Sequence, residues 1–143
     1  MINPRIDTTS GDDGDPVVLA GFDLPGAESG AAAHAVAAVS LERYRVAEMT
    51  ADDVLAMREL TALTDQLAEL AREEPLQHVQ MRPARLAALR DALAEFVEGR
   101  ESAEYVREED REPLAVLRPL LWPLDELCTR ALQAALRPSA AHC

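Results

Sequence analysis

Two segments of the chain repeat large apolar residues, leucine at all but one position, at spacings of three, four and three residues. Such spacing puts the leucines on one face of an α-helix, which must then be buried against another element. Pro75 follows the first segment, and Pro83 and Gly99 bound the second, as expected at helix ends. We therefore predict helices over residues 50–73 and 83–98. Their core residues are Leu60, Leu63, Leu67 and Leu70 in the first helix, and Leu86, Leu89, Leu93 and Phe96 in the second.

A third helix is predicted over residues 113–137, with a kink or break near 118–122 because Pro119 and Pro123 interrupt it. Its apolar stripe is wider than one neighbouring helix can cover, so part of it is expected either at the centre of a bundle or against a partner chain. From this helix we assign Leu117, Leu121, Leu124 and Leu132 to the core, and Leu120, Trp122, Leu127 and Leu136 as interface candidates.

The first third of the chain has a weaker pattern. Residues 1–15 are polar and acidic, which predicts a disordered arm. Residues 16–24 predict a strand bounded by prolines, residues 31–38 favour helix by composition, and alternation over 39–48 favours a second strand. The predicted fold is mainly α. It is an antiparallel three-helix bundle with one or two short N-terminal strands packed on it, forming one domain over residues 16–138 with a tail at 139–143.

The charge of the chain restricts its partners. Its 143 residues include 14 basic and 26 acidic side chains, which gives a net charge of −12. Such a surface repels phosphate backbones, so direct nucleic-acid binding is not expected. Every basic residue is arginine, which excludes a P-loop lysine and any Schiff-base lysine.

Membrane and metal chemistry are also disfavoured. No apolar run reaches the roughly 18 to 20 residues of a membrane-spanning helix, and residues 1–15 lack the apolar run of a signal peptide, so we expect a cytoplasmic protein. His34, His78, His142, Cys128 and Cys143 do not have the spacing of a zinc site, and we expect neither a metal nor a cofactor. Cys128 is interpreted as a small core side chain.

One short pattern points to an enzyme. Arg72 is followed by His78 with five residues between them, which resembles the arginine–histidine motif of small helical HEPN-type ribonucleases. In that family the two side chains lie at the scissile phosphate, and the resemblance would make Arg72 and His78 the catalytic pair. Pro75 interrupts a continuous helix between them, and Glu73 and Glu74 would repel RNA.

The leading hypothesis is therefore a non-enzymatic interaction module: a small acidic helical adaptor, accessory subunit or regulator that binds a protein partner. The simplest partner is a second copy, which would form a homodimer through the last helix. The alternative is a HEPN-like ribonuclease, or a toxin–antitoxin or defence component, that uses Arg72 and His78. A third interpretation is small-molecule binding in an apolar pocket around Trp122.

Overall fold

The computed structural model describes residues 1–11, 14–44, 50–73 and 76–136. These residues form a three-stranded antiparallel sheet, five α-helices and a short 3₁₀-helix. The elements in chain order are β1 (Ile2–Ser10), β2 (Pro16–Pro25), α1 (Gly26–Tyr44), α2 (Ala51–Glu73), β3 (Leu76–Met81), α3 (Pro83–Glu101), α4 (Glu108–Leu117), the 3₁₀-helix η1 (Arg118–Leu120) and α5 (Leu121–Leu136).

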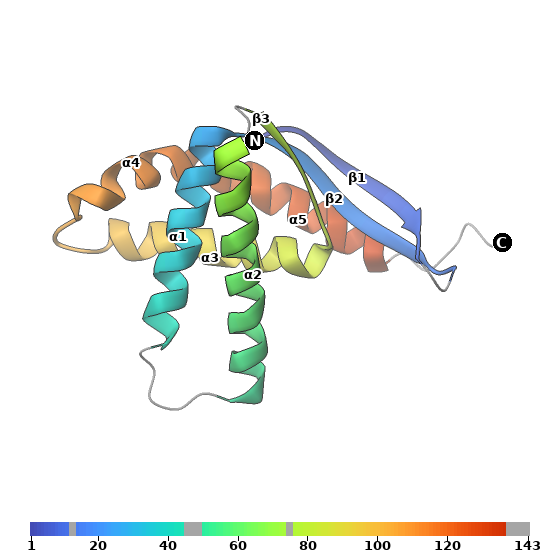
Figure 1. Cartoon of the computed structure of the whole chain (residues 1–143), viewed down its shortest axis with the longest axis horizontal. Coiled ribbons are helices and arrows are strands. Elements are labelled where there is room, and N and C mark those ends of the chain that lie inside the picture. The colour runs from blue at the N-terminus through green and yellow to red at the C-terminus, as the bar shows by residue number, and fades with distance from the viewer. Residues whose placement is uncertain (12–13, 45–49, 74–75, 137–143) are drawn as a thin grey trace.

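The sheet has the strand order β1-β2-β3, with β2 in the centre. Successive side chains of a strand point to opposite faces, and β2 follows this rule. Ala20, Phe22 and Leu24 are buried on one face, and Asp23 belongs to the other. Val79 and Met81 of β3 are also buried. The apolar face is covered by helices, chiefly α5, which runs beneath β1 and β2 (Figure 1).

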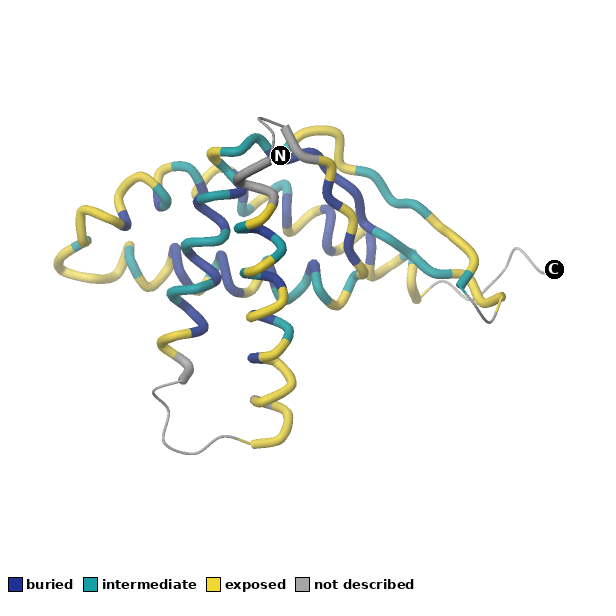
Figure 2. The backbone as a smooth tube through the Cα atoms, in the orientation of Figure 1, coloured by how far each residue is buried: buried dark blue, intermediate teal, exposed yellow. Residues whose placement is uncertain are grey.

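The helices form a core on that face. Helix α3 contacts both α1 and α5, so its apolar residues lie in the middle of the fold. Helices α1 and α2 are antiparallel neighbours that extend together away from the sheet (Figure 1). Burial is concentrated where these elements meet, and the outer face of α2 is exposed (Figure 2). The fully buried large side chains of the helices are Val36, Val39, Leu60, Leu63, Leu67, Leu86, Leu89, Leu93, Phe96, Leu117 and Leu127.

The prediction of a three-helix bundle is wrong. The chain has an α+β architecture, because residues 2–10 form β1 and residues 76–81 form β3 beside the predicted strand β2. The residues expected to be a disordered arm thus include a strand, which is ordered by pairing with β2. The strand expected over 39–48 is also wrong as far as the chain is described there. Helix α1 continues to Tyr44 in keeping with its alanine content, and residues 45–48 lie outside the described residues.

The leucine periodicity predicted helices α2 and α3 correctly. Helix α2 ends at the predicted residue 73, and α3 begins at the predicted Pro83. The third predicted helix is divided near Pro119 as expected, but its first part begins earlier, at Glu108, and includes Pro113. Of the predicted core, Leu121 is half-buried, Leu132 is exposed, and the side chain of Leu70 lies outside the described residues. None of the described helices is long and apolar enough to cross a bilayer.

Candidate functional site

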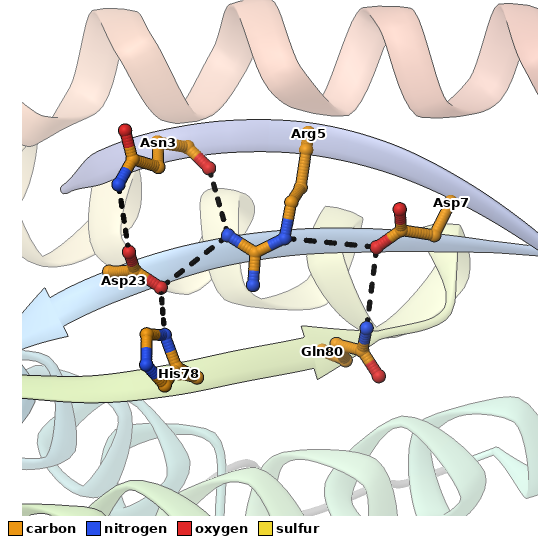
Figure 3. A network of polar contacts seen from close by, with 6 residues as sticks. All are labelled: Asn3, Arg5, Asp7, Asp23, His78 and Gln80. Carbon is orange, nitrogen blue, oxygen red and sulfur yellow. Dashed lines mark hydrogen bonds and ion pairs between the residues drawn. The ribbon is translucent and has the colours of Figure 1, made fainter.

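Six polar side chains form a cluster on the open face of the sheet (Figure 3). They come from all three strands, because alternation directs the polar residues of each strand away from the helices. Two of these residues, Asp23 and His78, lie opposite each other in the pairing of β2 with β3. The members of this cluster, called the sheet cluster below, are Asn3, Arg5, Asp7, Asp23, His78 and Gln80.

Asp23 is the centre of the sheet cluster, although it lies on the open face. It is only 3% exposed because its neighbours cover it. Nδ2 of Asn3 donates to Oδ2 at 3.1 Å, and Nη1 of Arg5 lies 3.4 Å from Oδ1, which also contacts Nδ1 of His78. The hydrogen bond from His78, supported by that from Asn3, lowers the pKa of Asp23 below its ordinary value. Asp23 is therefore ionised at neutral pH.

Gly21 creates the space in which Arg5 lies across β2. A Cβ atom at Gly21 would stand 3.0 Å from Nε of Arg5, which is tighter than most side-chain contacts, so the Arg5 side chain would have to shift by a few tenths of an ångström. Arg5 Nε also lies 3.8 Å from Oδ2 of Asp7, which accepts a hydrogen bond from Gln80 at 3.3 Å. The resulting network connects β1, β2 and β3 through side chains as well as through the backbone.

His78 is the chemically most versatile member of the sheet cluster. Its side chain is 73% exposed, and Asp23 is its contact partner among the described residues. In a neutral imidazole, an ionised carboxylate at Nδ1 favours the tautomer with the proton on that nitrogen, in which Nε2 carries a lone pair. A histidine oriented in this way by an aspartate has the geometry of a general base or of a hydrogen-bond acceptor for a partner.

The outer edge of β1 adjoins the sheet cluster. Among the described strands, β1 pairs with β2 alone, so alternate N–H and C=O groups of β1 point away from the sheet. Figure 1 shows β1 as the outermost strand. Its first residues are irregular, with a bulge between Ile2 and Arg5 and a left-handed Asn3 (φ 52°). From Arg5 to Ser10 the pairing with β2 is continuous, which leaves a regular free edge of six residues.

The structure describes no contact between Arg72 and His78, the predicted catalytic pair. His78 lies on β3, whereas Arg72 belongs to the last turn of α2, and the Arg72 side chain is outside the described residues. The partner of His78 that the structure describes is Asp23, which our sequence interpretation missed. The available signal was local: Asp23 is the polar residue between Phe22 and Leu24 in a strand that is otherwise apolar there.

The four interface candidates of the last helix separate into two pairs. Leu120 and Leu127 are buried in the chain's own core, so this conformation does not offer them to a partner. Trp122 and Leu136 are exposed near opposite ends of α5. The apolar cavity beneath α5, lined partly by Leu120 and Leu124, has a volume of about 10 Å³. That volume holds at most one water molecule, so it gives no support to small-molecule binding there.

A second polar cluster lies between α1, α3 and α4, where Asp110 contacts His34 and Arg100. Open pockets of about 340 and 390 Å³ lie beside it, and Asp110 lines the first and His34 the second. Within the described ranges, no group of three or more histidine, cysteine, aspartate or glutamate side chains is placed to hold a metal ion. Comparison of the chain with protein families, with curated proteins and with solved structures finds no match.

Proposed function

We propose that this chain is a non-enzymatic interaction module that binds a protein partner along the outer edge of β1 and the adjoining sheet cluster. The observation that carries the proposal is the regular free edge from Arg5 to Ser10. An added strand would satisfy the outward N–H and C=O groups of this edge, and neighbouring side chains would select the partner.

The sheet cluster supports the same proposal. Asp23 and Arg5 hold each other in place on the open face, so a partner would meet an ordered polar surface. Because these side chains are already ordered, binding would cost little conformational entropy. Arg5 and Asp7 remain about one-third exposed and present both signs of charge. Such a surface favours a partner with complementary charges at matching positions.

Site-specific photo-cross-linking tests the proposal in the native cell. A benzoylphenylalanine placed at Thr9, an exposed residue of the free edge, is expected to form a discrete protein adduct. The matched control carries the same group at Ala115, which is exposed on α4 away from the sheet. A protein adduct at Thr9 and none at Ala115 supports the edge as a binding surface. No adduct at Thr9, or the same adducts at both positions, contradicts it.

One observation favours the alternative of a ribonuclease. Asp23 holds His78 through Nδ1, which leaves Nε2 of an exposed imidazole available as a general base. If the chain cleaves RNA through this group, His78→Ala abolishes cleavage, and Arg72→Ala tests the resemblance-based pair separately. Glu112→Ala is the control, because Glu112 is exposed on α4 and lies outside the sheet cluster. Cleavage that persists in His78→Ala would exclude His78 as the base.

A further inference from the structure

We infer that the partner strand at the edge of β1 is β1 of a second copy, which produces a symmetric homodimer with a continuous six-stranded sheet. The inference rests on the proposed function, because it identifies the partner of the same edge. A two-fold axis through the edge would pair β1 antiparallel with itself, so that one surface serves both copies.

Three residues of the regular segment, Arg5, Ile6 and Asp7, are self-complementary in one register. With Ile6 opposite Ile6 of the second copy, Arg5 lies opposite Asp7 of that copy and Asp7 opposite its Arg5. Opposite charges directly across two strands are favourable, whereas like charges there are unfavourable. A shift that centres the pairing on Asp7 places two aspartates opposite each other, so charge selects the register centred on Ile6.

Burial agrees with this register. Arg5 and Asp7 have side chains that are 37% and 38% exposed, so both can be reached by a second copy. Ile6 lies on the other face, where it packs against the edge of the core but is only partly buried. A second Ile6 at that position would cover its remaining apolar surface.

Cysteine cross-linking tests the register. Residues on the two-fold axis of an antiparallel pair have Cα atoms about 4.5–5.5 Å apart, which a disulfide spans. In a Cys143→Ser background, where the remaining native thiol Cys128 is buried, Ile6→Cys is expected to form a reducible dimer under mild oxidation. Thr8→Cys is the matched control. In the register centred on Ile6, the two copies of Thr8 do not lie opposite each other, so this variant is expected to form the disulfide about tenfold more slowly. Faster cross-linking of Thr8→Cys overturns the inferred register.

Solution mass tests the dimer itself. Sedimentation equilibrium of the unmodified chain is expected to give twice the mass of one chain, and Asp7→Arg, which places guanidinium groups opposite each other, is expected to halve it. Glu112→Arg on the exposed face of α4 makes the same charge change elsewhere and is expected to keep the dimer. Circular dichroism confirms that each variant is folded.

The two proposals fail in distinguishable ways. A monomeric wild-type chain, or a dimer that Asp7→Arg leaves intact while it stays folded, overturns the homodimer at this edge. If the Thr9 cross-linker then captures a different protein, the interaction module stands and only the identity of its partner changes. If the Thr9 cross-linker captures nothing, the proposed function fails as well.

Discussion

His34 on α1 and Asp110 on α4 are in direct contact, with Nε2 and Oδ1 2.7 Å apart, although 76 positions separate them in the chain. The other carboxylate oxygen of Asp110 accepts a hydrogen bond of 3.2 Å from Nε of Arg100. Arg100 also pairs with Glu42 at 2.8 Å and lies over the ring of Phe96 at 4.7 Å. One buried carboxylate therefore joins three helices that the sequence gives no reason to connect.

Replacement of Asp110 tests how much these contacts stabilise the fold. Asp110→Ala leaves Arg100 without its more buried partner, so we expect the free energy of unfolding to fall by about 2 to 4 kcal/mol. Urea denaturation measures the loss. The control Glu112→Ala, on the exposed side of the same helix, is expected to change stability by less than about 0.5 kcal/mol. Equal effects in both variants would show that the helix, and not the buried network, is responsible.

The same carboxylate predicts the acid sensitivity of the fold. Burial acts to raise the pKa of Asp110, but the hydrogen bonds from His34 and Arg100 outweigh it and lower the pKa below the ordinary 3.8. As the pH falls from about 5 towards 3, the unfolded chain takes up a proton before the folded chain does, so stability falls. Urea unfolding at a series of pH values should show this decline, and Asp110→Asn should make it shallower. An unchanged decline in Asp110→Asn would assign the acid sensitivity to other carboxylates.

The wide apolar stripe of α5 predicts opposite outcomes at two of its residues. Leu127 is 1% exposed, so Leu127→Ala should leave a cavity and cost about 2 to 5 kcal/mol. Trp122 is 73% exposed, so Trp122→Ala should change the stability of the monomer by less than about 0.5 kcal/mol. Thermal unfolding of both variants at low concentration decides between these values. A large loss for Trp122→Ala would mean that this ring is covered in solution.

Replacement of two glycines by alanine is expected to change the stability of the fold in opposite directions. Gly99 lies in α3 with open space around the position of a Cβ, so Gly99→Ala should stabilise the fold by about 0.5 to 1 kcal/mol through helix propensity. Gly14 has a φ of +82°, so Gly14→Ala should destabilise it by about 1 to 2 kcal/mol. The melting temperatures of the two variants should move in opposite directions. If both rise, the left-handed conformation of Gly14 is not maintained in solution.

From the sequence alone, the elements marked by a local pattern of apolar residues or by prolines could be predicted. Helices α2 and α3 were predicted near their observed bounds because their apolar residues recur at the spacing of the face they bury. Strand β2 was predicted because prolines bound its short apolar run. The break near Pro119 followed from the missing backbone donor of proline. In the sheet cluster, only His78 was selected in advance, and it was paired with Arg72 on the strength of a short motif.

The tertiary structure decided the rest, because the contacts involved join residues distant in the chain. Strand β1 is polar and has no apolar period, and its order comes from β2, to which it pairs. Asp23 and His78 are 55 positions apart, and only the register of β2 with β3 places them together. The apolar sequence pattern that includes Leu127 is the same whether this side chain packs into the core or against a partner chain. A local pattern states that a side chain must be covered, and only the packing of distant segments determines what covers it.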